Sequence, residues 1–362
     1  MSAVRAAMVW NPSKTDRETL EEPLLRVFDA DEIAWFETTV DDPGQGVAAQ
    51  ALATAPEVVI VAGGDGTVRA VAEHLADVRA DVDLGLVPLG TGNLLARNLD
   101  VPLRNVPAAV ERAATGTPRG IDVGWVEVDL AEGAERHAFV VMIGFGIDAN
   151  MIAETDEGLK SKAGWLAYVE SLGRALRASD LVSFELTVDD EPGRDETGHT
   201  LLIGNCGTLQ AGFALLPDAD PGDGELDFLM LSADGLAPWL GTLTTMLWDS
   251  NLGRMIRRDD DDGSTDTDDI THGRAHSIHV SLPAPRVFQI DGENLAQSID
   301  GGNATSSVST NNLQVFAPLR RLQVLAGVDL GGGLLTPNGD GVHDGLTVSF
   351  RPKGVSILPI RA

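Results

Sequence analysis

Two glycine-rich loops constrain the fold of this chain more than any other feature. Residues 63–67 read Gly-Gly-Asp-Gly-Thr and residues 88–93 read Pro-Leu-Gly-Thr-Gly-Asn, and each follows a short apolar run. Residues 58–62 predict a buried strand, and residues 68–75 predict the helix that leaves the first loop. Glycine lets the backbone approach a phosphate closely, while a helix N-terminus offers free N–H groups and a partial positive charge. The two loops therefore predict one phosphate-binding crevice.

Asp65 is the one charged residue of these two loops. A carboxylate beside phosphates is repulsive unless a cation lies between them. Mg²⁺ binds carboxylates and phosphates together, so we expect it at this position.

The first third of the chain alternates strand and helix patterns. Expected strands cover residues 6–10, 33–38, 58–62 and 84–87, and expected helices cover residues 19–28, 47–55, 68–75, 94–99 and 106–114. This alternation is typical of a parallel sheet with helices on both faces, whose ligands bind at the carboxyl ends of the strands. We therefore expect an α/β domain over residues 1–122, with both glycine loops at its ligand-binding edge.

Longer runs of β-forming residues follow this domain. They cover residues 121–128, 137–143, 182–188, 200–205 and 226–231. Successive strands favour a mostly antiparallel, β-rich second domain, expected over residues 123–293. Residues 294–345 are rich in Gly, Ser, Asn and Thr and predict an irregular insertion. Residues 346–362 return to strand patterning, and we expect them to rejoin the first domain.

The charge of the chain excludes one class of partner. Its 362 residues include 26 Lys and Arg against 55 Asp and Glu, which gives a formal net charge of -29. Nucleic-acid binding needs a basic face, so we expect no nucleic-acid partner. Two origins of this acidic composition stay open: function in high salt and the codon bias of a GC-rich genome.

The sequence predicts a cytoplasmic protein. Its single cysteine, Cys206, excludes an intrachain disulfide and favours a reducing compartment. No secretion leader precedes the first strand, and no stretch approaches the roughly 18 apolar residues of a transmembrane segment. Action at the inner face of a membrane is compatible with these features, and a monomer and a homodimer both stay open.

An ordered series of motifs carries a family resemblance. It comprises Asn11-Pro12, both glycine loops and the segments 94–99, 121–124, 144–149, 217–219, 223–227 and 291–293. In this order the motifs are similar to those of the diacylglycerol kinase catalytic domain family, in particular the soluble bacterial and archaeal lipid kinases. The resemblance implies a NAD kinase/diacylglycerol kinase-like fold, with ATP and Mg²⁺ as cofactors. It also implies transfer of the γ-phosphate of ATP to a lipid hydroxyl.

The implied substrate is a lipid at the membrane surface, of diacylglycerol-like, sphingoid or archaeal glycerol-ether type. Its chains are expected in an apolar cleft of the second domain. Two other functions stay open. One is a NAD kinase-like small-molecule kinase, which shares residues 63–67, and the other is a non-catalytic nucleotide-binding regulatory protein.

The resemblance also implies nucleotide contacts. Positioning and charge neutralisation supply most of the catalysis in phosphoryl transfer. The implied contacts are Asn11, Thr39, Gly63, Gly64, Asp65, Gly66, Thr67, Gly90, Thr91, Asn93 and Asp122. The alternatives are a tight strand-to-helix turn for the first glycine loop and a plain turn cap for Asn11.

Two cation sites are implied in the same way. Asp65 and Asp122 are expected to hold Mg-ATP between the domains. A structural Mg²⁺ is expected at Asp220, Asp223 and Glu225, with the Asp223 carboxylate and neighbouring backbone carbonyls as ligands. The alternative for the second site is a solvated acidic hairpin.

The resemblance places the general base in residues 291–293, Asp-Gly-Glu. Glu293 or Asp291 would take the proton from the attacking lipid hydroxyl, and we favour Glu293. The alternative is that this Asp-Gly pair only forms a turn.

The chain departs from the family pattern in three places. Residues 13–15 lack the glycine that is usual after Asn-Pro, so the phosphate contacts of this loop stay open. Arg69-Ala70 stand where Asn-Glu is usual, and Arg69 is expected either to pair with a phosphate or to face solvent. The insertion at residues 294–345 follows the expected base, where it either covers the site or lies beside it.

Overall fold

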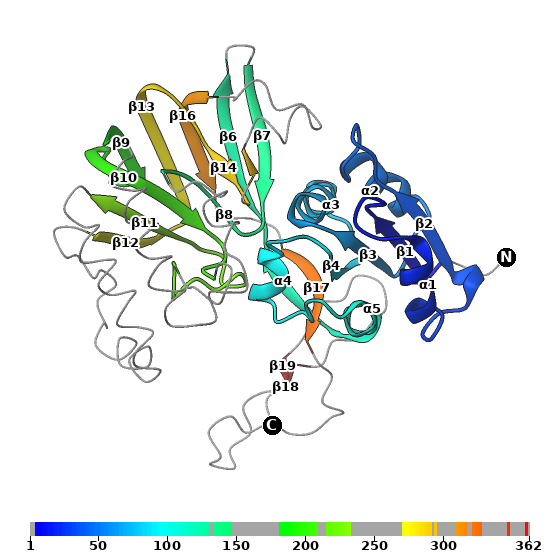
Figure 1. The fold of residues 1–362 in the computed structure, drawn as a ribbon. Coiled ribbons are helices and arrows are strands. Elements are labelled where there is room, and N and C mark those ends of the chain that lie inside the picture. Colours follow the sequence, from blue (N-terminus) through cyan, green and yellow to red (C-terminus); the bar gives the residue numbers. More distant parts are fainter. Residues whose placement is uncertain are drawn as a thin grey trace, which may run out of the picture.

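A computed structural model describes most of the chain as two sheets that stand side by side (Figure 1). The described residues are 4–130, 133–146, 181–208, 215–232, 270–291, 293–294, 309–316, 321–327, 346–347 and 359–360.

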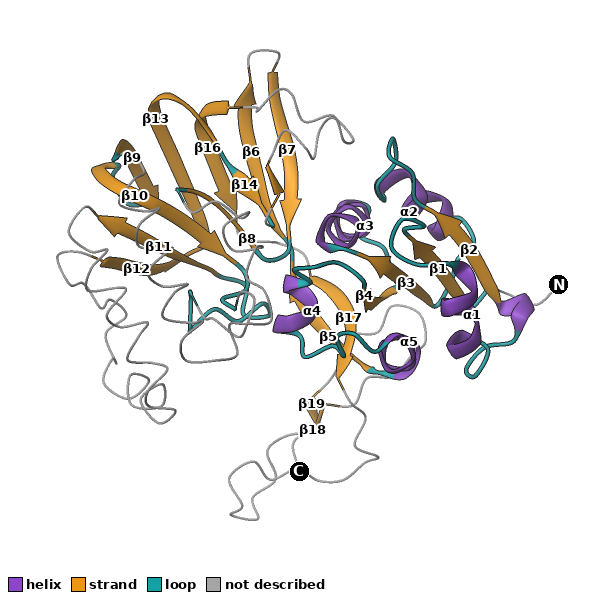
Figure 2. Ribbon diagram, in the orientation of Figure 1, coloured by secondary structure: helices purple, strands orange, loops and turns teal. Residues whose placement is uncertain are grey.

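The first sheet contains the four predicted parallel strands and two further strands. The predicted ones are β1 (Ala6–Trp10), β2 (Ile33–Glu37), β3 (Val58–Gly63) and β4 (Asp83–Pro88), and the further ones are β5 (Thr117–Asp122) and β17 (Arg321–Gly327). Their order across the sheet is β2-β1-β3-β4-β17-β5, and β1 to β4 pair in parallel. Every residue of β1 and β3 is buried, because helices cover both faces of the sheet (Figure 2).

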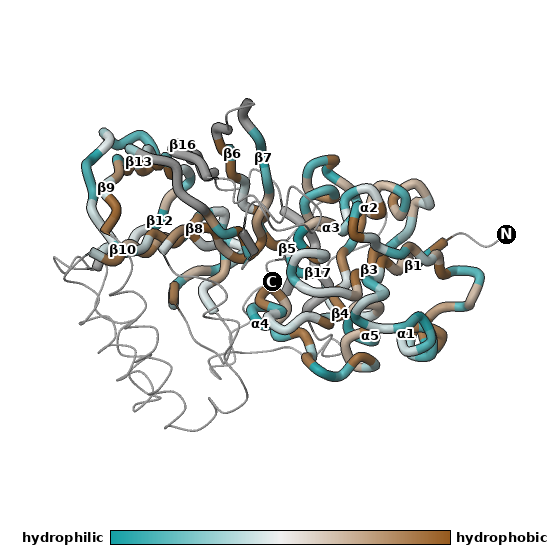
Figure 3. The backbone as a smooth tube through the Cα atoms, turned by 45° about the horizontal axis from the view of Figure 1, so that its top comes forward, coloured by the Kyte–Doolittle hydropathy of each residue, from teal (hydrophilic) through white to brown (hydrophobic). Residues whose placement is uncertain are grey.

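Five α-helices surround this sheet within the described residues. They are α1 (Arg17–Leu24), α2 (Gln45–Leu52), α3 (Asp65–Asp77), α4 (Leu94–Asn98) and α5 (Val106–Thr115), and a 3-10 turn (Ala30–Glu32) precedes β2. Successive residues of a strand point to opposite faces. Val9 of β1 therefore packs in one cluster with α2 and α3, whereas Met8 packs in another with α1 and α5. Figure 3 shows the apolar centre that results, with hydrophilic residues on the outer turns.

Strand β17 corrects one prediction. It runs parallel to β4 and antiparallel to β5, so it lies inside the first sheet. From the sequence, residues 321–327 are expected in an irregular insertion, and residues 346–362 are expected to rejoin the first domain. Instead, β18 (Leu346–Thr347) and β19 (Pro359–Ile360) form a separate two-stranded sheet. Strands β4 and β5 each have backbone N–H and C=O groups on the edge that faces the other strand. These groups need hydrogen-bond partners, and β17, which lies between the two strands, supplies them.

The second sheet has eleven strands within the described residues, and all their pairings are antiparallel. Its strands are β6 (Gly124–Leu130), β7 (Gly133–Phe139), β8 (Met142–Phe145), β9 (Val182–Val188), β10 (Arg194–Gly204), β11 (Leu226–Ser232), β12 (Ile270–Ala275), β13 (Ser277–Val287), β14 (Gln289–Ile290), β15 (Glu293–Asn294) and β16 (Ser309–Phe316). Strand β16 lies between β13 and β6, although its residues were also assigned to the insertion. The predicted fold class, a parallel α/β domain followed by an antiparallel β domain, is confirmed.

The two sheets join at Val123. The run predicted as one strand is divided there, since β5 ends at Asp122 in the first sheet and β6 begins at Gly124 in the second. A Cβ atom on Gly124 would collide with the ring of Phe139, so glycine permits this close pairing. One buried apolar cluster includes residues of both sheets, which makes the join part of the core.

Candidate functional site

The two glycine loops lie at adjacent strand ends and touch each other. Gly63 at the end of β3 is paired with Pro88 at the end of β4. A Cβ atom on Gly90 would lie 2.8 Å from the Cα atom of Gly64, so this approach requires glycine. Helix α3 begins directly after Gly64, and its N-terminus adjoins the first loop. The loops form one glycine-lined cradle, whose backbone fits phosphate at a helix N-terminus.

Asp65 joins the two loops. Its carboxylate accepts hydrogen bonds from the backbone N–H groups of Asn93 at 2.7 Å and Leu94 at 2.6 Å. Asn93 has a φ of 49°, and its side chain bonds the N–H and C=O groups of Gly90. Asp65 therefore caps helix α4 across 28 residues of sequence. The sequence predicted action through a cation, whereas the structure gives this carboxylate two backbone donors.

The other predicted nucleotide contacts of the first domain differ in their hydrogen bonds and in their exposure to solvent. Asn11 accepts hydrogen bonds from the N–H and hydroxyl groups of Ser13, which is the turn-cap role of the alternative interpretation. Thr39 accepts a hydrogen bond from an N–H group of its own turn. Thr67 is only 6 % exposed, while Thr91 is exposed on the second loop. Thr91 and the glycine backbone are thus the accessible parts of the cradle.

Asp122 lies beneath a loop of the second domain. Its side chain is fully buried, and its Oδ2 atom accepts a hydrogen bond from the N–H group of Gly224 at 2.7 Å. Its own N–H group donates to the carbonyl of Pro221 at 2.6 Å. Asp122 therefore holds the loop of the predicted structural metal site against the first sheet.

The carboxylates of that loop are paired within the protein. Asp220 accepts a hydrogen bond from Arg119 at 2.7 Å. Arg274 lies 3.4 Å from Glu225 and 3.9 Å from Asp223. Within the part of the chain that the structure describes, no group of three or more acids, histidines or cysteines is placed to hold a metal ion. These side chains do not converge on a resident cation at either predicted site.

Asp291 is anchored inside the second sheet. It follows β14 with a φ of 50°, and both of its carboxylate oxygens accept hydrogen bonds. Oδ2 accepts from the N–H group of Val140 at 2.9 Å, and Oδ1 accepts from those of Val141 at 2.8 Å and Met142 at 2.9 Å. Burial raises the pKa of Asp291 to about 6, although the hydrogen bonds oppose this shift.

This geometry separates the two candidate bases. The Asp291 carboxylate is 2 % exposed and is occupied by three donors. Glu293 follows the turn in β15, where its backbone pairs with Ile290 of β14. The turn interpretation therefore describes Asp291, and Glu293 stays the base candidate of the sequence analysis.

Asn205 connects Asp122 with the Asp291 turn, and the sequence analysis missed it. The residue is 1 % exposed, and its Nδ2 group donates to the carbonyls of Asp122 at 2.8 Å and Val140 at 3.3 Å. The available signal was a polar residue that follows the apolar run 201–203 after Gly204. A polar side chain at the buried end of a strand must find partners, and here it finds them in both domains.

One of the two interpretations expected Arg69 to face solvent. The structure buries this residue instead. Its side chain is 4 % exposed, and its Nη1 atom lies 3.6 Å from Oε2 of Glu73, one turn further along α3. The same Oε2 atom accepts a hydrogen bond from the N–H group of Ala138 in β7 at 3.3 Å. Burial lowers the pKa of the neighbouring His137, an effect that Glu73 opposes and Arg69 strengthens. Charged groups thus tie α3 to the second sheet.

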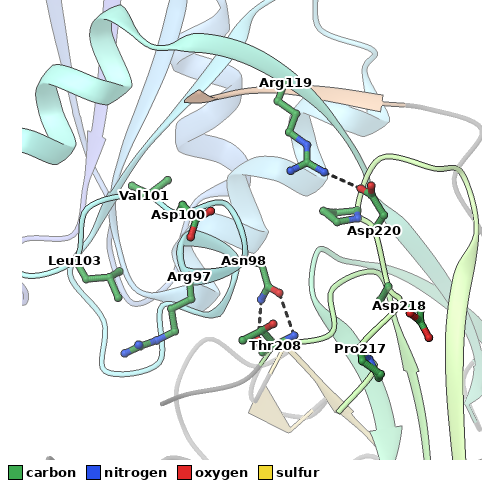
Figure 4. Close-up of a pocket in the computed structure, with 12 residues that line it drawn as sticks. Arg97, Asn98, Asp100, Val101, Leu103, Arg119, Thr208, Pro217, Asp218 and Asp220 are labelled. Atoms are coloured by element: carbon green, nitrogen blue, oxygen red, sulfur yellow. Dashed lines mark hydrogen bonds and ion pairs between the residues drawn. The ribbon is translucent and has the colours of Figure 1, made fainter. Parts of the chain in front are cut away.

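A polar cavity of about 810 Å³ lies where α4 meets the second domain. Asn98 of α4 forms two hydrogen bonds with the backbone of Thr208, and Arg119 pairs with Asp220 on another wall (Figure 4). Arg97 also lines the cavity and donates from Nε to a carbonyl of the second glycine loop. Charged and apolar residues both line the walls, and three of the charged ones are Asp100, Asp218 and Asp220, so this cavity differs from the apolar lipid cleft that was predicted.

Comparison with known proteins agrees with the motif order. A model of the diacylglycerol kinase catalytic domain matches residues 6–126, and a model of the YegS C-terminal NAD kinase beta sandwich-like domain matches residues 141–317. The Xanthomonas campestris protein named "Probable lipid kinase YegS-like" is 34% identical over 252 residues, which cover 66% of this chain and 77% of that one. The chain belongs to the diacylglycerol kinase and YegS-like lipid kinase family.

Other proteins named for this lipid kinase family match over similar lengths. A diacylglycerol kinase of Mycobacterium tuberculosis is 27% identical over 248 residues, covering 68% of this chain and 73% of that one. A solved diacylglycerol kinase structure from Bacillus anthracis shares the fold, with a TM-score of 0.57 and 20% identity, covering 89% of this chain and 96% of that one. None of the helices in the described ranges is long and apolar enough to cross a membrane.

Proposed function

We propose that this protein is an ATP-dependent lipid kinase, which transfers the γ-phosphate of ATP to a hydroxyl group of a lipid at a membrane surface. The observation that carries the proposal is the glycine cradle. Two loops held together by Asp65 lie at the N-terminus of α3. Family membership supports kinase chemistry, and the cradle supports a nucleotide phosphate as the donor.

In this proposal the first domain binds and orients the nucleotide. The backbone around Gly64 and Gly66 faces the phosphates at the start of α3, and Asp65 holds the second loop, with Thr91, beside them. Mg²⁺ bound to the phosphates of the nucleotide would neutralise their charge in this cradle. The role left to the protein is to fix the geometry of the phosphates.

The second domain binds the lipid acceptor and accepts the proton of its hydroxyl group. The lipid hydroxyl oxygen attacks the γ-phosphorus, the bond from that phosphorus to the β–γ bridging oxygen breaks, and ADP leaves. Glu293 accepts the hydroxyl proton, while Asp291 anchors the turn through its three backbone donors. The acceptor is a diacylglycerol-like, sphingoid or archaeal glycerol-ether lipid, and the reaction takes place at the inner face of the membrane.

A lipid panel with mass analysis of the products tests this proposal. The protein is incubated with Mg-ATP and vesicles that each contain one of the three lipid classes. We expect one class to gain a single phosphate group. If no lipid gains phosphate while NAD does, the protein is a small-molecule kinase and the proposal fails. ATP binding without transfer to any acceptor would instead indicate a regulatory protein.

A further inference from the structure

Asn205 is a buried amide whose hydrogen bonds reach both domains. It follows β10, which runs toward the join of the two sheets (Figure 1), and only 1 % of the residue is exposed. Its Nδ2 group donates to the carbonyl of Asp122 at the end of β5 and to that of Val140 after β7. Carbonyl oxygens only accept, so the NH₂ side of the amide must face both. One small group therefore joins the two domains.

The segment 140–142 is held at its backbone on the second-domain side of this bridge. Its three N–H groups donate to the carboxylate of Asp291. The carbonyl of Val141 accepts hydrogen bonds from the N–H groups of Asn205 at 2.8 Å and Cys206 at 3.0 Å. Because donors and acceptors of the segment are both occupied, it is fixed in place relative to Asn205.

Asp122 is fixed on the first-domain side. It pairs with Arg321 of β17 within the first sheet. Its N–H group donates to the carbonyl of Pro221, and its Oδ2 atom accepts from the N–H group of Gly224. The Nδ2 group of Asn205 thus connects two parts of the molecule that are each held by several other bonds.

The other half of the amide gives stability no reason to keep asparagine here. Within the part of the chain that the structure describes, the Oδ1 atom of Asn205 has no hydrogen-bond partner. A buried acceptor without a donor costs free energy. An apolar side chain of the same shape would lose the two Nδ2 bonds but would also remove this cost. A role in holding geometry explains the amide better than a role in stability.

We propose that Asn205 is a positioning residue for phosphoryl transfer, whose amide locks the segment 140–142 to Asp122 and so aligns the second domain with the first. In the proposed function the two domains bind the phosphate donor and the acceptor separately, and transfer needs the reacting atoms in one geometry. The hydrogen bonds of Asn205 go to residues 122, 140 and 141, and none goes to the glycine cradle. The effect on transfer rests on the proposed kinase function, but the lock is a property of the folded protein.

Hydrogen exchange of backbone N–H groups tests the lock without a kinase assay. Leucine branches at Cγ as asparagine does, so Asn205→Leu fills the same space and donates nothing. We expect the N–H groups of Asp122 and of residues 140–142 to exchange about tenfold faster or more in this variant, and those of α5 to be unchanged. Asn205→Ala should act in the same direction. Faster exchange on one side only, or on neither, overturns the proposal.

Steady-state kinetics then test the positioning role. With the lipid that the original protein phosphorylates, we expect kcat of Asn205→Leu to fall about tenfold or more. The KM for ATP and the calorimetric ATP affinity should change by less than about twofold, because the cradle has no bond to Asn205. Rates are calculated per ATP site counted by calorimetry, so a loss of folded protein does not lower kcat.

Val110→Ala is the matched control for stability. This side chain of α5 is fully buried in a cluster that contains residues of the first domain only. The variant should lower the urea midpoint, as any core truncation does, while kcat stays within about twofold of the original value.

The two measurements fail separately. If exchange is faster on both sides while kcat is unchanged, Asn205 locks the domains without positioning the reaction, and that part of the proposal is wrong. If the original protein transfers phosphate to no lipid, the kinase function and the positioning role fail together, and the exchange result still decides the lock.

Discussion

The Asp65 carboxylate accepts two backbone hydrogen bonds across 28 residues of sequence, and this geometry determines what its substitution should do. A carboxylate oxygen faces each N–H group. In Asp65→Asn, one of the two oxygens becomes an NH₂ group that cannot accept. The second glycine loop then loses part of its attachment to the first, so folding and nucleotide binding are expected to suffer together.

Asp65→Asn should therefore lower the free energy of unfolding by about 1–3 kcal/mol, the cost of leaving a partly buried N–H group without its acceptor. ATP affinity should fall in the same variant because the cradle loosens. Urea unfolding and calorimetric titration with ATP measure the two effects. Asp16→Asn is the control, since that side chain accepts one hydrogen bond at the start of α1 and asparagine keeps the acceptor. If the Asp65 variant kept the original stability but lost ATP affinity, the result would indicate that the Asp65 carboxylate acts only through a bound cation.

At this scale the sequence identified important residues but not their partners. Asp65, Asp122 and Asp291 were all singled out, and all three carboxylates are held by backbone N–H groups. Every residue except proline has a backbone N–H group, so the sequence does not show which of these groups binds a carboxylate. The surroundings of Asn205 were missed for the same reason, because its Nδ2 group donates to the carbonyl of Asp122, 83 residues earlier in the chain.

Among the elements, β17 tests the long-range part of the fold. It lies between β4 and β5, and Leu322 is paired with Ile121 of β5. Leu322→Pro removes a backbone donor from an interior strand, which should cost about 3 kcal/mol or more. We expect loss of cooperative thermal unfolding or a greatly lowered midpoint. Leu346→Pro in the separate two-stranded sheet is the control and should unfold like the original protein.

Helix α4 carries the second element-scale prediction. Asn98 forms two hydrogen bonds with the backbone of Thr208, so it fastens the second glycine loop to the second domain. Asn98→Ala should lower the free energy of unfolding by about 1–3 kcal/mol and weaken ATP binding. Asn105→Ala removes the N-cap of α5, away from the cradle, and should cost about 1 kcal/mol with ATP affinity unchanged. Equal effects of the two variants on affinity would contradict the role given to α4.

The pattern of elements was easier to predict than their pairing. Strands β1, β3 and β4 came from periodicity and buried runs, which are local signals. The place of β17 depends on free backbone groups of β4 and β5, about 200 residues earlier in the chain. Local sequence contains strand propensity for residues 321–327 but no information on which sheet receives them.

The net charge of the whole molecule affects its access to a membrane. At a formal charge of -29, an anionic vesicle repels the protein most strongly at low salt. The Debye length falls from about 10 Å at 0.1 M to about 3 Å at 1 M. We therefore expect transfer to lipid in anionic vesicles to rise with salt, and to change less with zwitterionic vesicles as the control. A steady fall of activity from low ionic strength on anionic vesicles would contradict this prediction.

In the proposed mechanism the first domain holds the phosphate donor and the second domain carries the base, so transfer takes place between the two sheets. Single-turnover transfer of label from γ-labelled ATP to lipid, measured for the original protein and for Glu293→Gln with ATP affinity determined on the same samples, tests this claim most directly. We predict labelled lipid from the original protein and none from Glu293→Gln, with ATP bound equally well by both. Equal label transfer by the two proteins, or label found only in a soluble acceptor, would contradict it.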